Sequence, residues 1–389
     1  MFKVKTLNKI ASVGTKNFDK TRYDVGNNVE NPDAILVRSA NMLDMEIPDS
    51  LKAIARAGAG VNNIPIEKCS QKGVIVFNTP GANANAVKEL AIAALLLTSR
   101  NIVGGVNWAR TLPPDADIAK EVESGKKAFI GPELYGKTLG IFGLGAIGAM
   151  VANTAIELGM HVYGNDPYLT VESAWLLSHS VKRAKEAKTI YENCDYIAIH
   201  VPSTPETKGF INEQTIASMK NGVRIINLSR GDLVNNEDMA KALESGKVAC
   251  YLTDFPSADV MKMKNVIAIP HLGASTPESE DNCAVMAVSE IIDFLENGNI
   301  KNSVNFPDVI NPKGGDESVC VIHKNVPTML TQISSAISGA GLNIENLSSR
   351  SKKEMGYSVF EITGVCPDSV IEQLLSVEGI IRVNVVKNR

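Results

Sequence analysis

The stretch K-T-L-G-I-F-G-L-G-A-I-G, from Lys137 to Gly148, decides the fold of this chain. It predicts a buried strand, a tight turn and the start of a helix, with glycines in a G-x-G-x-x-G spacing. We expect Gly143 to permit the turn, Gly145 to let a phosphate approach the backbone, and Gly148 to allow close helix packing. The amides and the dipole at the start of such a helix suit a pyrophosphate. Because the motif alone is weak, its surroundings decide the interpretation.

The residues after this stretch complete a dinucleotide-binding pattern. A second apolar strand, Met160 to Gly164, ends in Asn165 and Asp166. An acidic residue there accepts hydrogen bonds from a ribose 2′-hydroxyl and repels a 2′-phosphate, which favours NAD over NADP. The alternative is a glycine-rich turn followed by an acidic loop. The order strand, glycines, helix, strand and acid favours the nucleotide.

The composition is that of an ordinary globular protein. The chain has 389 residues, of which 44% are hydrophobic and 21% are charged, and its net charge is −4. This length allows two or three domains. We find no basic block, no apolar run of transmembrane length and no signal-peptide core, so we expect no nucleic acid or membrane as partner and a cytoplasmic location. The six cysteines are scattered, which indicates reduced thiols, and we expect no metal site.

Strands and helices alternate along most of the chain, which predicts parallel sheets covered by helices. Before the glycine stretch we expect strands at 34–39, 52–57 and 74–80, followed by an apolar helix over 86–100. After the last strands of the nucleotide domain, a capped helix begins near Thr276 and returns to the first set of strands. The nucleotide domain is therefore expected to be an insertion.

We predict an α/β protein with two doubly wound parallel-sheet domains and a C-terminal module. Residues 1–98 and 275–300 form a flavodoxin-like substrate-binding domain, and residues 99–274 form a Rossmann NAD-binding domain inserted in it. Residues 301–316 are a turn-rich linker with an expected hinge at its two adjacent glycines. Residues 317–389 follow a βαββαβ order, which is ferredoxin-like and small enough for an independent module.

Arg230 and His271, at the ends of two predicted strands, are the residues that we single out for chemistry. Hydride transfer between a 2-hydroxy acid and nicotinamide needs a base for the hydroxyl proton, which suits histidine, and a cation for the carboxylate, which suits arginine. A phosphate-loop arginine and a strand-end histidine bonded to backbone are the structural alternatives. Arg38 and Arg56 also end strands and are either anion contacts or surface arginines in ion pairs.

Four motifs resemble the successive signatures of the D-2-hydroxyacid dehydrogenase family: G-L-G-A-I-G with Asp166, H-V-P-S-T-P-E-T, N-L-S-R-G-D-L-V-N and P-H-L-G-A-S-T. The resemblance spans residues 50–300. It implies Arg230 as the substrate-binding catalytic arginine and His271 as the general acid/base. It also implies cofactor contacts, which fall on Thr79, Gly143, Gly145, Ala146, Ile147, Gly148, Asp166, Val201, Pro202, Thr207, Leu228, Ser229, Asp254, Gly273 and Ala274.

The chain departs from the family around the histidine. The family has a glutamate that pairs with it, within D-V-F-P-x-E-P, whereas this chain has T-D-F-P-S-A-D-V. Counted from Asp254, the glutamate position holds Asp259; aligned on Phe-Pro, it holds Ala258. Asp259 is therefore a candidate catalytic residue, and a histidine without a carboxylate partner is the alternative.

The C-terminal segment resembles an ACT domain through V-I-H-K-N-V-P-T-M-L and G-L-N-I, although Thr328 replaces the usual glycine. The resemblance implies L-serine as an effector that is bound by His323, Asn325 and Asn343. Asparagine amides can both donate to a carboxylate and accept from an ammonium group. Turn chemistry and a plain dimer interface are the alternatives.

The resemblance of the dehydrogenase motifs, together with that of the ACT-like tail, implies an NAD-dependent oxidation of 3-phospho-D-glycerate (3-phosphoglycerate) to 3-phosphohydroxypyruvate, the first step of serine biosynthesis. Arg38 or Arg56 would meet the substrate phosphate. The alternatives are a hydroxypyruvate or glyoxylate reductase of the same family and a non-catalytic NAD-sensing binding protein. The resemblance also implies a homodimer through the nucleotide domain or a homotetramer.

Overall fold

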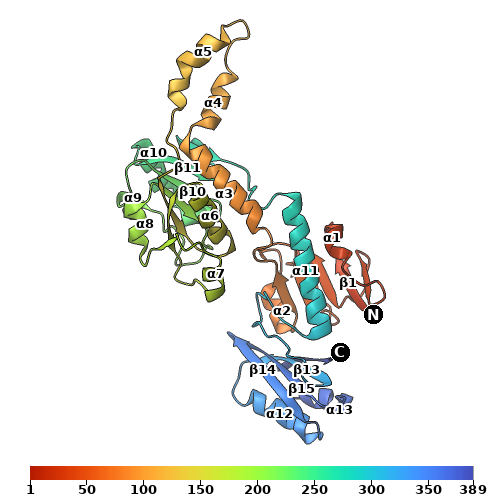
Figure 1. Ribbon diagram of the computed structural model, residues 1–389. Coiled ribbons are helices and arrows are strands. Elements are labelled where there is room, and N and C mark those ends of the chain that lie inside the picture. Colours follow the sequence, from red (N-terminus) through yellow and green to blue (C-terminus); the bar gives the residue numbers. More distant parts are fainter. Residues whose placement is uncertain (389) are drawn as a thin grey trace. The chain divides into compact units, whose positions relative to one another are not determined.

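The computed structural model describes residues 1–388, which form two compact units (Figure 1). The first unit contains Met1–Asn83 together with the described residues from Pro277 onward, and the second contains Ala84–Thr276. The second unit is therefore an insertion in the first.

The first unit is built on a five-stranded parallel sheet with the strand order β2-β1-β3-β4-β5, the flavodoxin-like order. Its strands are β1 (Phe2–Thr6), β2 (Tyr23–Gly26), β3 (Ala34–Val37), β4 (Ala53–Arg56) and β5 (Ile75–Asn78), with the short helices α1 (Ser12–Thr15) and α2 (Ile66–Gln71) between them. The sequence analysis missed β1 and β2. Val4 and Tyr23 are the fully buried residues of these two strands, so the apolar signal is weak.

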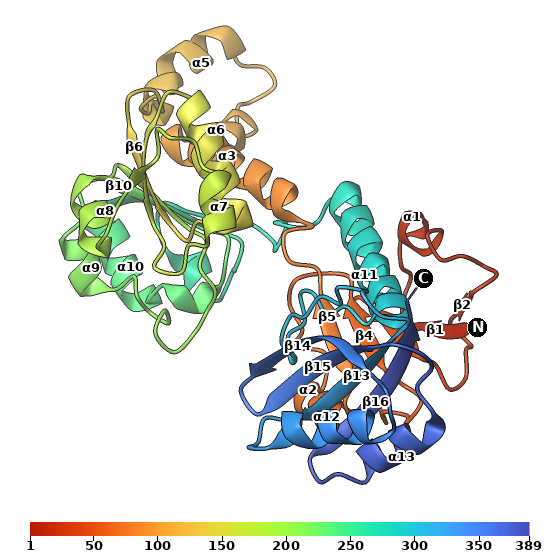
Figure 2. The same ribbon diagram turned by 60° about the horizontal axis from the view of Figure 1, so that its bottom comes forward.

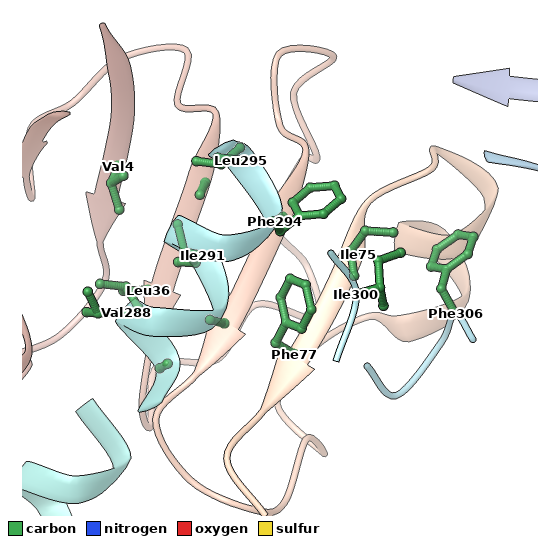
Figure 3. Packing of buried hydrophobic residues seen from close by; sticks show 14 of the residues in the cluster. Val4, Leu36, Ile75, Phe77, Val288, Ile291, Phe294, Leu295, Ile300 and Phe306 are labelled. Atoms are coloured by element: carbon green, nitrogen blue, oxygen red, sulfur yellow. The ribbon is translucent and has the colours of Figure 1, made fainter. Parts of the chain in front are cut away.

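Helix α11 (Pro277–Asn297) covers one face of this sheet (Figures 2 and 3). Its Ile291 and Leu295 follow helical spacing and pack in one cluster with Leu36 and Phe77 of the sheet (Figure 3). The neighbours of Leu36 along β3 belong to a cluster on the opposite face, because successive strand residues alternate. Truncating Ile291 or Phe77 to alanine would cost about 2–5 kcal/mol.

The second unit is built on a seven-stranded parallel sheet with the order β12-β11-β10-β9-β6-β7-β8. Its strands are β6 (Thr138–Phe142), β7 (His161–Asn165), β8 (Lys182–Arg183), β9 (Tyr196–Ile199), β10 (Val223–Asn227), β11 (Val248–Thr253) and β12 (Val266–Ala268). The order reverses between β6 and β9, which is where open parallel sheets bind ligands. In the register, Phe142 lies opposite Asn165 and Ile199, so the ends of three strands meet at this edge.

Helix α3 (Ala84–Ser99) begins the second unit. Its Ala91 and Leu95 pack with Leu139 and Val151 in the core of the seven-stranded sheet. The boundary predicted from the sequence leaves this helix in the substrate-binding domain, whereas its contacts assign it to the nucleotide-binding unit. The other helical segments around this sheet are α6 (Ala146–Glu157), α7 (Val171–Trp175), α8 (Ala187–Asn193), α9 (Glu213–Ala217), η2 (Gly231–Leu233), α10 (Asn236–Glu244) and η3 (Val260–Lys262).

An arm extends from the second unit (Figure 1) and consists of α4 (Ile102–Ala109), α5 (Ile118–Gly125) and the 3-10 turn η1 (Lys126–Phe129). None of these three segments contains a buried residue. Their internal packing rests partly on the rings of Trp108 and Phe129, whose centroids lie 5.4 Å apart. The arm therefore exposes apolar side chains, among them Ile102, Val103, Val106, Ile118 and Val122.

The C-terminal module is a four-stranded antiparallel sheet with the order β14-β15-β13-β16 and a βαββαβ connection. Its elements are β13 (Glu317–Lys324), α12 (Met329–Gly339), β14 (Ile344–Lys352), β15 (Met355–Ile362), α13 (Asp368–Leu375) and β16 (Ile380–Lys387). The predicted fold class, with two parallel-sheet domains and a ferredoxin-like module, is confirmed.

Both faces of the four-stranded sheet are covered. Val319 and Val321 face a core with α12 and α13, whereas the alternating residues Cys320 and Ile322 belong to the cluster around α11. The hydroxyl of Tyr357 donates to the carbonyl of Gly298 at 2.6 Å. The module therefore shares a core with the five-stranded sheet and is not an independent body.

The linker is fixed at both ends. The Asn305 side chain donates to Val74 O and accepts from Val76 N at 2.9 Å each, so it runs along β5. Gly314 N donates to Glu361 Oε1 at 2.9 Å, and a Cβ on Gly315 would lie 2.5 Å from Ile362 O. Close approach to β15, rather than free rotation, explains why glycine occupies the predicted hinge.

Within residues 1–388, no single helix is long and apolar enough to cross a membrane; α3 and α4 meet that criterion only together, as a pair bent by 69°.

Candidate nucleotide-binding and active site

The three glycines of the first motif each have a distinct steric reason. Gly143 has a φ of 87°, and a Cβ there would lie 2.5 Å from His200 O. A Cβ on Gly148 would lie 1.9 Å from Gly143 O, so the helix packs tightly on the turn. A Cβ on Gly145 would meet no atom within 4 Å. Gly145 therefore borders open space, as expected where a phosphate approaches the backbone.

The N-terminus of α6 faces that open space with free donors. Gly145 is its N-cap and supplies no side-chain hydrogen bond, and Ala149 N is the amide that bonds back to Gly145 O. The first amides of a helix lack intrahelical acceptors, so those of Ala146 and Ile147 can donate to a pyrophosphate.

Asp166, at the end of β7, is held next to the glycine turn. Its two carboxylate oxygens accept from Leu144 N and Tyr168 N at 2.8 Å each. A carboxylate can accept further hydrogen bonds, so ribose hydroxyls can still bind. A cavity of about 210 Å³ adjoins Asp166 and is lined by Leu144, Leu177 and Arg183, among others. It offers space and an apolar wall for the adenosine half of a dinucleotide.

The turn after β10 carries Arg230 and is fixed by Asn227. Asn227 is fully buried; its Nδ2 donates to Arg230 O at 2.8 Å, and its Oδ1 accepts from Ser229 N at 3.1 Å. Ser229 Oγ donates to Ile199 O at 2.7 Å, which ties this turn to β9. Arg230 itself is exposed. Sequence reasoning missed Asn227, although its signal is the asparagine that opens N-L-S-R-G.

The loop after β9 closes on itself. Thr207 Oγ1 donates to Pro202 O at 2.7 Å and accepts from Thr204 N at 2.8 Å. This fixes the predicted cofactor contacts Val201, Pro202 and Thr207 beside the glycine turn, because Val201 also borders Gly143.

Asp254 is a buried carboxyl group that interacts with the charged residues of the site. It is 1% exposed, and neither carboxylate oxygen has a hydrogen-bond partner among the described residues. Burial raises the pKa of Asp254 above its usual range, and the charge of His271, the nearby backbone amide of Gly273 and the charge of Arg230 oppose that rise. Asp254, His271 and Arg230 therefore interact at one edge of the sheet. A buried acceptor without a donor fits a ligand that brings one, such as a carboxamide.

His271 is exposed and packs on a neighbouring aromatic ring. Its ring centroid lies 4.8 Å from that of Phe255 at an angle of 57°, and Gly273, after it, lies close to Asp254. The ion pairs within residues 1–388 include none with His271. Asp259 is exposed at the N-cap of η3. The carboxyl group whose charge interacts with His271 is Asp254.

His200 is a polar residue of this edge that sequence reasoning did not assign. Its Nε2 is buried and has no hydrogen-bond partner in the described part of the chain, although the residue as a whole is partly exposed. Burial lowers the pKa of His200 to about 4, so the ring is neutral near pH 7. The histidine that opens H-V-P-S-T was its signal in the sequence.

The predicted anion contacts lie at the strand ends of the first unit. Arg38 forms an ion pair with Glu280 of α11 at 2.5 Å. Arg56 is partly buried, donates to Arg38 O at 3.1 Å, and has a pKa that burial lowers. Thr79, another predicted cofactor contact, belongs to this unit, and its buried Oγ1 has no partner among the described residues.

The predicted effector residues of the C-terminal module already have partners. His323 is 4% exposed, and its Nδ1 and Nε2 bond to Lys324 O and Ser358 Oγ at 2.8 Å each. Asn325 Nδ2 donates to Lys353 O at 3.2 Å, and Asn343 Nδ2 donates to Glu345 Oε1 at 2.7 Å. These side chains therefore stabilise the module.

No group of three or more His, Cys, Asp or Glu side chains within residues 1–388 has an arrangement that could hold a metal ion. The open space at Gly145, the free amides of α6 and the unpartnered carboxylate of Asp254 instead fit a dinucleotide.

Comparison with known proteins agrees with this site. Residues 92–273 match the sequence model of "D-isomer specific 2-hydroxyacid dehydrogenase, NAD binding domain". The D-3-phosphoglycerate dehydrogenase of Bacillus subtilis is 39% identical over 285 residues, which are 71% of this chain and 52% of that protein. That of Methanocaldococcus jannaschii is 34% identical over 304 residues, which are 76% of this chain and 56% of that protein. The chain spans about half the length of the curated relatives it matches.

Solved structures share the fold. The NAD⁺-bound 3-phosphoglycerate dehydrogenase of Entamoeba histolytica is 28% identical, with a TM-score of 0.58, over 78% of this chain and 98% of that one. The apo D-mandelate dehydrogenase of Rhodotorula graminis also shares the fold. It is 24% identical, with a TM-score of 0.66, over 80% of this chain and 99% of that one. Residues 92–273 of this chain therefore form an NAD-binding domain of the D-isomer specific 2-hydroxyacid dehydrogenase type.

Proposed function

We propose that this protein is an NAD-dependent dehydrogenase that oxidises 3-phospho-D-glycerate to 3-phosphohydroxypyruvate. The observation that carries the proposal is the group of Arg230, Asp254 and His271 at the sheet edge that also holds the glycine turn. The relatives at 39% and 34% identity, both D-3-phosphoglycerate dehydrogenases, support the choice of substrate.

Each residue has a defined task in this reaction. Arg230 binds the substrate carboxylate through its planar donors. His271 takes the proton of the 2-hydroxyl group as the carbon–oxygen double bond forms. The amides at the start of α6 would hold the pyrophosphate of NAD⁺, and the nicotinamide would supply the hydride acceptor for C2. Asp254 accepts a hydrogen bond from the cofactor and stabilises the positive charge that His271 gains.

For the substrate phosphate we propose Arg38 or Arg56, the two arginines at strand ends of the first unit. Within the described residues, Arg56 donates a hydrogen bond through Nε to Arg38 O, which leaves its two terminal guanidinium nitrogens for a ligand. Arg38 would exchange Glu280 for the phosphate. Both side chains are bidentate donors, which suit phosphate oxygens.

Substitution of Arg230 tests the assigned chemistry. Arg230→Ala should lower kcat/KM by roughly a thousandfold, while the NADH affinity stays within about twofold of the unchanged protein. Steady-state kinetics and NADH fluorescence titration give the two values, and His271→Gln serves as the matched variant for the proton transfer. Loss of NADH binding in Arg230→Ala would contradict the role.

The second candidate is a hydroxypyruvate or glyoxylate reductase. The ion pair of Arg38 with Glu280 favours it, because Glu280 neutralises the charge of an arginine that would otherwise bind a substrate phosphate. Rates of NADH-linked reduction of 3-phosphohydroxypyruvate and of hydroxypyruvate separate the two. A strong preference for the phosphorylated acid supports the first proposal, and equal rates support the second. Absence of turnover on either would leave an NAD-sensing protein.

We also propose that the chain forms a homodimer through the arm of the second unit, or a tetramer that contains this dimer. The exposed Ile102, Val106 and Val122 support this, since apolar patches on soluble proteins mark contact surfaces. Val106→Asp should convert the dimer to a monomer in light-scattering measurements. Val13→Asp, at an exposed valine of the first unit, is the control.

Regulation by serine is proposed for the C-terminal module on the resemblance to ACT domains. The assay with 3-phosphohydroxypyruvate, repeated with L-serine, tests it directly.

We propose the cytoplasm as the compartment, which the six free cysteines of the described chain support.

A further inference from the structure

A cavity of about 590 Å³ opens at the carboxyl ends of β1 and β2 in the first unit. Thr6 and Gly26, the last residues of these strands, line it together with α1 and the loops on either side. Ligands of open parallel sheets bind at such ends. The cavity lies on the side of the sheet where β2 forms the edge, away from β4, whose last residue is Arg56.

The lining of this cavity is rich in hydrogen-bond donors and positive charge. Lys9, Lys16 and Lys20 contribute to it, and Asp24 is the single carboxylate among the described residues that line it. The three lysines are exposed and take part in none of the ion pairs within residues 1–388. A concave surface lined by one sign of charge concentrates ions of the opposite sign.

Asn8 connects this cavity to the loop after β3. Its Oδ1 accepts three backbone hydrogen bonds, from Arg38 N at 3.3 Å, Ser39 N at 3.1 Å and Ala40 N at 2.8 Å. Its Nδ2 has two further hydrogens to donate, and Asn8 lines the cavity. A ligand that accepts from Nδ2 would therefore be linked through one amide group to the backbone of Arg38.

We propose that this cavity binds a small multivalent anion, held by Lys9, Lys16, Lys20 and the Asn8 amide. Phosphate esters and polycarboxylates share the required chemistry, because both present several anionic oxygens to ammonium and amide donors. Binding would favour the conformation in which Asn8 holds residues 38–40. The site itself is independent of the proposed dehydrogenase activity, whereas its effect on the substrate through Arg38 rests on it.

Calorimetric titration of the full chain with inorganic phosphate, and separately with citrate, at low salt tests the site. The variant Lys9→Gln/Lys16→Gln/Lys20→Gln should raise the dissociation constant about tenfold, since each exposed charge contributes modestly. The control Lys324→Gln/Lys353→Gln/Lys387→Gln removes the same charge elsewhere in the first unit and should leave it unchanged. Equal dissociation constants for the two triple variants would overturn the proposal.

Asn8→Asp separates binding from the structural role of Asn8. The aspartate retains an oxygen for the three backbone amides but loses the Nδ2 donor and adds a negative charge. It should therefore weaken anion binding while hydrogen exchange at residues 38–40 remains slow. Unchanged binding in this variant would overturn the proposal.

The remaining outcomes assign the ligand or reject the site. Binding of phosphate alone supports a phosphate ester as ligand, and binding of citrate alone supports a polycarboxylate. Absence of binding by both probes would overturn the proposal. Binding that is lost in Arg56→Gln but kept in the Lys9, Lys16 and Lys20 variant would place the anion on the substrate arginine, and would also overturn it.

Discussion

Two regions of the molecule differ in whether their buried polar groups are hydrogen-bonded. They are the edge of the seven-stranded sheet and the four-stranded sheet of the C-terminal module. At the first, the carboxylate oxygens of Asp254 and the Nε2 of His200 are buried and have no hydrogen-bond partner within residues 1–388. In the second, His323 is also buried, but both of its ring nitrogens are hydrogen-bonded. Burying a polar group costs free energy unless the group is paired, so the first region leaves hydrogen-bonding capacity for a ligand, whereas the nitrogens of His323 are already paired within the module. Residue type alone does not distinguish these two situations.

The largest effect that would sharpen this comparison comes from two glycines of the nucleotide turn. Gly148→Ala places a Cβ 1.9 Å from Gly143 O and should destabilise the second unit by about 3 kcal/mol or more. Gly145→Ala meets open space, so the protein should fold normally but bind NADH at least about tenfold more weakly. Urea unfolding and fluorescence titration give both values. A Gly145→Ala protein that binds NADH normally would show that this space is not the phosphate site.

The next effect is a dependence of stability on pH. The pKa of His200 is lowered by burial from 6.5 to about 4, so the unfolded chain binds its proton at higher pH than the folded chain does. Stability should therefore be unaffected above pH 6.5 and should fall by about 3 kcal/mol as the pH drops to 4. Burial also lowers the pKa of His323, which adds to the loss.

Thermal unfolding of the unchanged protein and of His200→Asn between pH 7 and pH 4.5 measures this contribution. His200→Asn should flatten most of the decline, because asparagine does not titrate in this range. The control His323→Asn should flatten a smaller part. An unchanged slope in His200→Asn would mean that the ring is solvated and that its site is not closed.

The smallest effect is a change in the free energy of unfolding that has opposite signs at the edge of the seven-stranded sheet and in the C-terminal module. Asp254→Asn removes a buried carboxylate that has no partner and should stabilise the fold by about 1 kcal/mol near neutral pH, while NADH-dependent turnover falls. The pKa of Asp254 is raised in the folded protein, so ionisation near neutral pH stabilises the unfolded chain more than the folded one. Asparagine does not ionise, so the variant no longer carries this destabilising contribution. His323→Ala removes two hydrogen bonds and should destabilise the fold by about 1–3 kcal/mol without affecting NADH binding. Loss of stability in both variants would remove the distinction.

The sequence predicted most of what depends on local pattern. The glycine turn, the acidic end of β7 and the positions of Arg230 and His271 follow from motifs whose geometry is set within a few residues. The strands β1 and β2 were missed because each contains a single buried residue: β1 alternates valine with lysines, and β2 is a short edge strand. The assignment of α3 depended on which sheet it covers, and a run of alanines and leucines does not specify that.

What the sequence could not reveal are groups whose role depends on distant partners. Asn227 and Asn8 each hold a loop that carries a predicted functional arginine, yet as isolated asparagines both read as turn residues. The two adjacent glycines of the linker read as a hinge, whereas the structure needs them for close approach to β15. Tertiary contact decided each case.

The shared core beneath the C-terminal module limits how this chain can be shortened or recombined. Ile322 and Tyr357 lie in one cluster with Phe294 and Leu295 of α11. A chain that ends before residue 316 would leave that helix face bare, and the excised tail would expose the matching surface, so both fragments would tend to aggregate. Loss of a serine response after such a truncation would report damaged packing rather than lost regulation. The tail can be studied through single surface substitutions, and evolution cannot exchange it for another module without rebuilding the face beneath it.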